Sequence, residues 1–188
     1  IIFIYSLIYL YIHGHIKGKN NSIVWIIVVF LMTPLLAHVG SIFIGWDAVV
    51  SWNRWALELY NNTYDPINAA YPILLPSVWS ILYKIQGTSE VWWTVKLSLY
   101  VIPFTIIATL LTLYQETRDK TYLIILVFIY PLLIWNTSVG TISGYMDVPV
   151  MLIGLISLVV LYTAEKYKNN IYFENYIYVS LLLSGIAS

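Results

Sequence analysis

Long apolar runs separated by short polar segments dominate the pattern of this chain. A helix needs about 20 apolar residues to cross the hydrocarbon core of a bilayer. We predict a membrane helix in each run that approaches or reaches this length: 1–12, 23–45, 92–114, 122–136, 146–163 and 173–188. Because the first and last runs meet the ends of the sequence, we expect 1–188 to be a single membrane domain that is incomplete at both ends.

Basic residues are distributed unevenly over the segments between these runs. Three short segments carry most of them: Lys17, Lys19, Arg118, Lys120, Lys166 and Lys168. Positive charge accumulates in the cytoplasmic loops of membrane proteins, so we predict that these three segments are cytoplasmic. The loops 46–91 and 136–147 are then extracytoplasmic.

The loop 46–91 is too apolar and aromatic for a segment that is free in water. Tryptophan and tyrosine rings favour the headgroup region, so we predict two amphipathic helices along the membrane surface. The first runs from about Asp47, which suits an N-cap, to Tyr60. The second starts near Pro76 and stops at Gly87.

Composition supports the membrane prediction and narrows the class of function. Hydrophobic residues make up 60% of the chain, charged residues 10%, and the mean hydropathy is +0.80, whereas soluble domains have about a quarter charged residues. The net charge of zero gives no reason to expect nucleic-acid binding. The absence of cysteine excludes a disulfide framework and a thiolate metal site. We therefore predict an all-α, polytopic transmembrane helical protein.

Two acids follow apolar runs at the predicted outer edge of the membrane. The first begins a 4-3-4 spacing that puts acid, hydroxyl and cation on one α-helical face: Asp47, Ser51, Arg54 and Glu58. The second, Asp147, precedes Pro149, a residue that suits the first turn of a helix. A carboxylate near hydrocarbon is costly, which favours a functional role for both acids. The alternative is that each acid merely caps a helix.

Sugar transfer from a lipid phosphate would give these residues a chemical role. Such transfer needs a base for the acceptor's proton and a cation for the departing phosphate. Asp47 is the candidate base, and Arg54 or Lys84, or a divalent cation held by Asp47 and Asp147, would hold the phosphate. The alternatives are an ion pair of Arg54 with Glu58 and snorkelling of Lys84.

Polar and aromatic neighbours are candidates for sugar binding. Trp52, Trp55 and Tyr145 could stack on a sugar ring, and Ser51 lies on the predicted catalytic face. Anchoring at the interface accounts for any one of these aromatic residues equally well.

Three segments together resemble the polytopic GT-C glycosyltransferases, in particular the bacterial membrane proteins near family 39, the protein O-mannosyltransferases and the aminoarabinose transferase of lipid A. The segments are Trp46-Asp47-Ala48-Val49-Val50-Ser51-Trp52-Asn53-Arg54-Trp55-Ala56, Ala70-Tyr71-Pro72-Ile73-Leu74-Leu75-Pro76 and Gly144-Tyr145-Met146-Asp147-Val148-Pro149. The resemblance implies an extracytoplasmic acid at Asp47, a second acidic site at Asp147 and a polyprenyl-phosphate sugar donor. The chain departs from the mannosyltransferase pattern because Ala48 follows Asp47 and Asp147 stands alone.

We therefore predict a glycosyltransferase that acts on the extracytoplasmic side of a bacterial or archaeal plasma membrane. It would move a sugar to a hydroxyl of a glycan, lipid or protein, with inversion. Two alternatives remain. A transporter or lipid flippase would carry its acids inside discontinuous helices at mid-membrane, and a non-catalytic scaffold would use the 47–60 helix only as an anchor.

Overall fold

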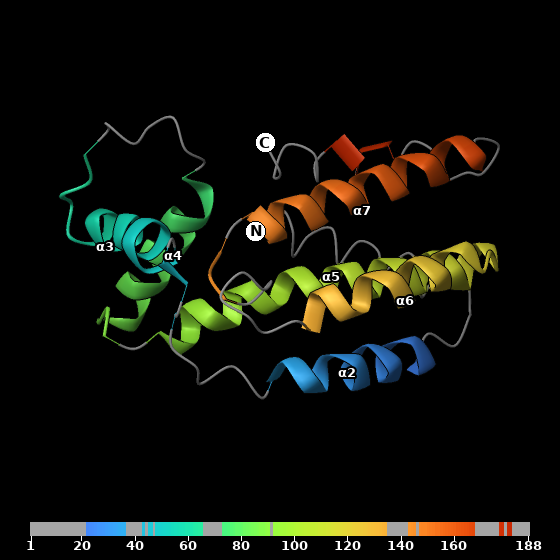
Figure 1. Ribbon diagram of the computed structural model, residues 1–188, viewed down its shortest axis with the longest axis horizontal. Helices are drawn as coiled ribbons and strands as arrows, with labels where there is room; N and C mark the ends of the chain where they lie inside the picture. Colours follow the sequence, from blue (N-terminus) through green and yellow to red (C-terminus); the bar gives the residue numbers. More distant parts are fainter. Residues whose placement is uncertain are drawn as a thin grey trace. The chain divides into compact units, whose positions relative to one another are not determined.

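The computed structural model of the protein is built from helices, and the part of the chain that it describes contains no strand (Figure 1). The described residues are 22–36, 43, 45–46, 48–65, 73–90, 92–134, 143–145, 147–167, 177–178 and 180–181. The predicted span 1–12 lies outside them, as does most of 173–188. An all-α fold, as predicted, is confirmed for the described residues.

Four apolar helices correspond to predicted spans. Helices α5 (Trp93–Thr117) and α7 (Asp147–Lys166) are long and apolar enough to cross a membrane. Helices α2 (Ser22–Leu36) and α6 (Thr121–Ile134) are apolar but shorter. Each begins within one or two residues of its predicted start.

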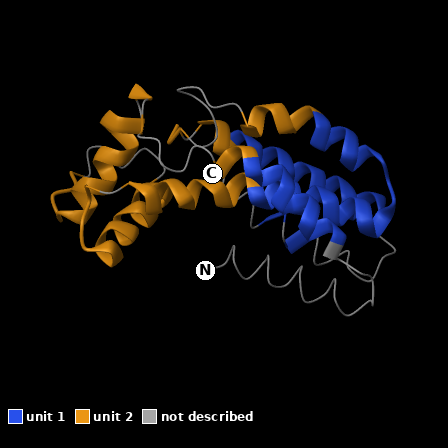
Figure 2. Cartoon of the chain, turned by 90° about the horizontal axis from the view of Figure 1, so that it is seen from below, with its two compact units in different colours: residues 1–33, 104–127, 151–187 blue, residues 34–103, 128–150, 188 orange. Residues whose placement is uncertain are grey.

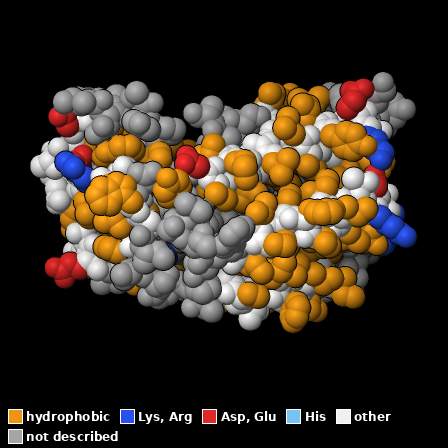
Figure 3. All heavy atoms as spheres, in the orientation of Figure 1, with side chains coloured by type: hydrophobic (Ala, Val, Ile, Leu, Met, Phe, Trp, Pro, Cys, Tyr) orange, Lys and Arg blue, Asp and Glu red, His pale blue; other side chains and the backbone are white. Residues whose placement is uncertain are grey.

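Large apolar side chains are exposed on all four of these helices. Examples are Phe30 in α2, Val101 in α5, Phe128 in α6 and Leu158 in α7. Hydrophobic side chains accordingly cover much of the described surface that is visible in Figure 3. Soluble monomers seldom expose large contiguous apolar patches, so this surface is consistent with helices that face lipid.

The chain divides into two compact units (Figure 2). Unit 1 comprises residues 1–33, 104–127 and 151–187, and unit 2 comprises residues 34–103, 128–150 and 188. Within unit 1, the rings of Trp25 and Phe104 stack with centroids 6.0 Å apart. The buried side chains of Ser157 and Ser180 each donate a hydrogen bond to the other's backbone carbonyl, at 2.8 and 3.0 Å.

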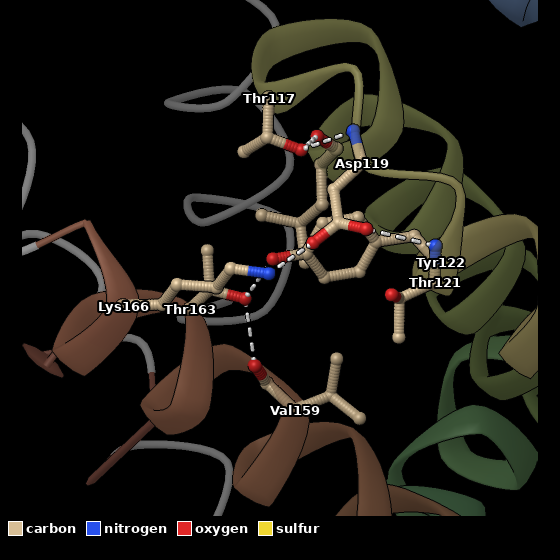
Figure 4. A network of polar contacts seen from close by, with 8 residues as sticks. Thr117, Asp119, Thr121, Tyr122, Val159, Thr163 and Lys166 are labelled. Carbon is tan, nitrogen blue, oxygen red and sulfur yellow. Dashed lines mark hydrogen bonds and ion pairs between the residues drawn. The ribbon is translucent and has the colours of Figure 1, made fainter.

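A polar clasp in unit 1 ties the turn between α5 and α6 to the last turn of α7 (Figure 4). Lys166 Nζ donates to Asp119 Oδ2 at 2.6 Å, and the backbone N–H of Thr121 donates to Asp119 Oδ1 at 3.0 Å. The buried hydroxyls of Tyr122 and Thr163 lie 2.8 Å apart. The hydrogen bond from Lys166, followed by that from Thr121, holds the pKa of Asp119 well below its usual range.

The clasp brings basic residues of two segments to the same end of unit 1. It places Arg118 and Lys120, which flank Asp119, at the same end of unit 1 as Lys166. These are cations that the charge distribution assigns to one side of the membrane. The structure thus agrees with the predicted pairing of these two segments, while the side of the membrane they face stays a prediction.

Unit 2 contains the helices of the first long loop. They are the π-helix η1 (Ala48–Asn53), α3 (Arg54–Tyr60) and α4 (Leu74–Gln86). Helix α4 ends as predicted at Gly87, whose φ of 76° provides the left-handed C-cap. Helix α3 packs against α4, and both contact η1.

Candidate functional site

Asp147, the second predicted acid, is the first residue of α7, and its side chain is exposed. Pro149 lies in the first turn, as predicted. A carboxylate at this end of a helix interacts favourably with the helix dipole, so stabilisation of the helix start accounts for Asp147 as well as catalysis does. Asp47, the predicted base, lies outside the described residues, and so does its predicted N-cap role.

The turn before Asp147 nevertheless contacts the segment that follows Asp47. Gly144 has a φ of +91°, and a Cβ at this position would lie 2.6 Å from Cδ1 of Phe43 and 3.0 Å from the Cβ of Ala48. Only glycine fits this space and this backbone conformation without displacement of its neighbours. The segments that carry the two predicted acids therefore meet within unit 2.

Phe43, which makes this contact, also lies at the centre of an aromatic cluster. Its ring stacks on Trp79 and Trp92, with centroid distances of 5.2 and 5.3 Å. The ammonium of Lys96 lies 4.8 Å from the centroid of the Phe43 ring. Each such aromatic pair contributes about 0.5–1.5 kcal/mol beyond the burial of its area. Through Phe43, this Phe43 cluster (Phe43, Trp79, Trp92 and Lys96) packs against Gly144.

Lys96 is a residue of this region that the sequence analysis did not select. It lies near the start of α5 and is only 2% exposed. A buried ammonium is costly unless other groups stabilise its charge, and the face of the Phe43 ring is one such group. The available signal was a single cation just inside an apolar run, because a charge in that position is seldom retained without a role.

Sequence reasoning also missed a pair of residues, Asn53 and Tyr83, that joins η1 to α4. Tyr83 Oη donates to Asn53 Oδ1 at 2.6 Å, and both residues are buried. The ring of Tyr60 meets that of Tyr83 edge-on, with centroids 6.2 Å apart. Burial raises the pKa of Tyr83 above its usual value, so its hydroxyl stays a neutral donor. The bond holds the end of η1 on α4.

The prediction of one continuous α-helical face over 47–58 is wrong, because η1 is a π-helix. Its i→i+5 bonding places more residues in each turn than an α-helix does, so the 4-3-4 spacing does not hold from Ala48 to Asn53. The α-helical spacing holds only from Arg54 to Glu58. Their Nε and Oε1 atoms form an ion pair at 2.8 Å, which is the structural alternative given above for Arg54.

The remaining candidates in the loop differ in accessibility. Trp55 is buried, and its ring meets that of the half-buried Trp52 edge-on at 5.1 Å. Packing of this kind gives Trp55 a structural role, and sugar binding by its ring stays a prediction. Ser51, in η1, is half-buried, and the side chain of Arg54 remains 68% exposed.

Lys84 and Tyr145 occupy separate elements of unit 2. Lys84 is exposed in the last turn of α4. Tyr145 is half-buried, and its backbone N–H donates to the hydroxyl of Ser143 at 3.2 Å. Both positions leave the side chain accessible from outside the packed core.

A metal site is predicted only through Asp47 and Asp147. Among the described residues, no group of three or more His, Cys, Asp or Glu side chains is placed to hold a metal ion. Because Asp47 lies outside those residues, a divalent cation at this site stays a prediction.

Comparison of the chain with protein-family models, with curated proteins and with solved structures finds no match.

Proposed function

We propose that this protein is a membrane glycosyltransferase with a GT-C-like arrangement of about six spans. It would move a sugar from a polyprenyl-phosphate donor to an acceptor hydroxyl on the extracytoplasmic side. The observation that carries this proposal is the close approach of Gly144 to Ala48 and Phe43. It supports a single site to which both Asp47 and Asp147 belong.

A membrane location is supported by α5 and α7, which are long and apolar enough to span. The exposed indole rings of Trp46 and Trp93 in unit 2 are typical of the headgroup region. A site at this level would meet a lipid-borne donor without removing the donor's polyprenyl chain from the bilayer. We assign the location to a bacterial or archaeal plasma membrane on the resemblance described above.

In the proposed mechanism, Asp47 removes the proton from the acceptor hydroxyl as the hydroxyl oxygen attacks the anomeric carbon. A new C–O bond forms on the face opposite the donor phosphate, so the anomeric configuration is inverted. The bond between the anomeric carbon and the phosphate oxygen breaks, and polyprenyl phosphate leaves with the electron pair. Arg54 holds that phosphate through guanidinium N–H groups that Glu58 does not occupy.

Asp147 has a supporting role in this scheme. Its exposed carboxylate at the start of α7 would orient the sugar, or would hold a divalent cation together with Asp47. A cation there would stabilise the departing phosphate. Asp147 lies at the start of α7, which the proposed topology puts at the outer edge of the membrane rather than at its middle, and this position disfavours a transporter or flippase.

The proposal is tested with the purified protein in proteoliposomes. These are supplied with polyprenyl phosphates that carry mannose or aminoarabinose, together with lipid, glycan or peptide acceptors. We expect transfer from at least one donor, with the product anomer inverted as read by NMR. Retention of configuration would contradict the mechanism. Absence of transfer from every donor, by protein that keeps its helical circular dichroism spectrum, would contradict the proposed function.

A further inference from the structure

Helix α4 has one buried and one exposed apolar face. The buried face carries Pro76, Trp79, Ser80 and Tyr83. The exposed face carries four apolar side chains at a 4-3-4 spacing, which is the spacing of one helical stripe: Leu74, Val78, Ile81 and Ile85. Ile81 is 56% exposed and Ile85 is 78% exposed. We call these four residues the α4 stripe.

Two hydrogen bonds fix α4 to the beginning of α5, within unit 2. Trp79 Nε1 donates to Ser98 Oγ at 3.2 Å, and Thr94 Oγ1 donates to the amide oxygen of Gln86 at 2.6 Å. The middle and the end of α4 therefore lie beside the first two turns of α5. Any membrane that α5 enters must begin close to α4.

The first turns of α5 expose an apolar stripe of their own. Trp93, Leu97 and Val101 follow one another at intervals of four positions, and all three are exposed. Spacing of i, i+4 and i+8 keeps them on one side of the helix. In a spanning α5 this side would face lipid, with Trp93 at the level of the headgroups. The exposed apolar surface of unit 2 thus includes α4 and the entrance of the span.

The charge on α4 also suits a phospholipid surface. The helix contains no acidic residue, and its cation, Lys84, is exposed next to Ile85 in the last turn. A lysine beside an apolar stripe extends its stem along the hydrocarbon and keeps its ammonium in the headgroup region. There it meets lipid phosphate.

From these observations we propose that α4 docks in the outer leaflet, with the α4 stripe among the acyl chains and Lys84 on phospholipid phosphates. The partner is the surface of an anionic bilayer. Helices of this kind bury their apolar face about 5–10 Å into the boundary between headgroups and acyl chains. The inference rests on the proposed membrane location but is independent of the transfer chemistry. It assigns Lys84 to bulk phospholipid rather than to the donor.

Spin labels provide the test, because the chain lacks cysteine and every introduced thiol is unique. Single variants Ile81→Cys, Val101→Cys and Asn61→Cys are labelled with a nitroxide in proteoliposomes that contain anionic phospholipid. For each variant, the collision rate of the nitroxide with oxygen, which concentrates in lipid, is measured. It is compared with the collision rate of the nitroxide with a water-soluble nickel chelate. Val101 is the lipid reference, and Asn61, the exposed C-cap of α3, is the water reference.

We expect the label at residue 81 to match that at residue 101, with a several-fold higher ratio of oxygen to nickel collisions than at residue 61. A label at residue 81 that matches residue 61 would overturn the proposal, and so would one shielded from both reagents by protein. Failure of the Val101 label to reach lipid would instead contradict the membrane location. Ile85→Cys repeats the test at an independent position.

The contribution of Lys84 is measured in the same system. In the labelled Ile81→Cys protein, Lys84→Gln should move the label toward water in anionic vesicles and leave it unchanged in zwitterionic ones. An equal effect in both kinds of vesicle would overturn the assignment of Lys84 to anionic phospholipid.

Discussion

The ring of Phe43 fills the space that a side chain at Gly144 would need, because Cδ1 of Phe43 lies 2.6 Å from the position of a Cβ there. This contact joins the segment after α2, which contains Phe43, to the turn before α7, which contains Gly144. It also brings Ala48 within 3.0 Å of the same position. Packing of this turn therefore controls how the two acid-bearing segments approach each other.

Gly144→Ala should destabilise the protein. The added methyl group meets Phe43, and overpacking of this kind costs about 1–3 kcal/mol. A left-handed backbone costs a residue with a Cβ about 1–2 kcal/mol more. Thermal unfolding followed by circular dichroism in detergent micelles should show a lower midpoint than for the unaltered protein.

Alanine variants of two other glycines distinguish the effect of the Phe43 contact from the effect of the left-handed backbone. A Cβ at Gly154 meets nothing within 4 Å, and Gly87 combines open space with a φ of +76°. We therefore expect Gly154→Ala, inside α7, to be neutral or slightly stabilising because alanine is the better helix former, and Gly87→Ala to have an intermediate effect. Equal decreases in the midpoint for the alanine variants at residues 144 and 87, which share a left-handed backbone, would show that the Phe43 contact is unimportant.

The Asn53–Tyr83 bond should behave as a coupled pair. Tyr83→Phe leaves the buried Asn53 oxygen without its donor, which costs about 1–3 kcal/mol. The double variant Tyr83→Phe/Asn53→Leu should lose less free energy of unfolding than the two single variants lose in total. The expected difference is about 0.5–3 kcal/mol. Unfolding of the four proteins measures this coupling, and Tyr178→Phe, at an exposed position, is the control. If the losses of unfolding free energy in the two single variants simply add up in the double variant, the result would contradict the bond.

Arg54 and Glu58 can be separated by their effects on transfer. If Arg54 holds the donor phosphate, Arg54→Ala should lower kcat/KM by about ten- to a hundredfold, as for loss of hydrogen bonds to a charged group. Glu58→Gln should leave kcat/KM unchanged and reduce stability by about 0.2–0.5 kcal/mol, the value of an i,i+4 pair. Similar kinetics for both variants would mean that the ion pair is merely structural.

Acid should weaken the clasp between Asp119 and Lys166. Hydrogen bonding lowers the pKa of Asp119 in the folded protein, so its stabilising effect is complete above the unfolded value of about 3.9. It is lost as the pH falls below that value toward the folded pKa. Unfolding midpoints between pH 7 and pH 3 should fall less steeply in Asp119→Asn, whereas Glu90→Gln should keep the unaltered profile. Parallel profiles for all three proteins would contradict this account.

Local signals predicted much of the helical fold. Apolar length predicted α5 and α7, and Gly87 marked the end of α4 because only glycine adopts a left-handed C-cap at little cost. Basic residues predicted that the turn at Arg118 and the end of α7 share one side, and the bond from Lys166 to Asp119 agrees. Each of these features depends on residues close together in sequence or on a simple sum of charge.

The geometry of the site could not be predicted in the same way. The π-helical winding of η1 has no signal in residue spacing, so the predicted face of Asp47 and Ser51 assumed the wrong period. Burial of Lys96 depends on Phe43, more than 50 residues away in sequence. Such long-range contacts are set by tertiary packing, which one sequence does not reveal.

The central claim is that Asp47 is the base of a transfer reaction, and the rate of sugar transfer by Asp47→Asn tests it most directly. Asp65→Asn, an exposed acid of the same loop, is the matched control. In proteoliposomes with equal amounts of inserted protein, we predict that Asp47→Asn abolishes transfer while Asp65→Asn retains the unaltered rate. Transfer by Asp47→Asn at the unaltered rate would contradict the account.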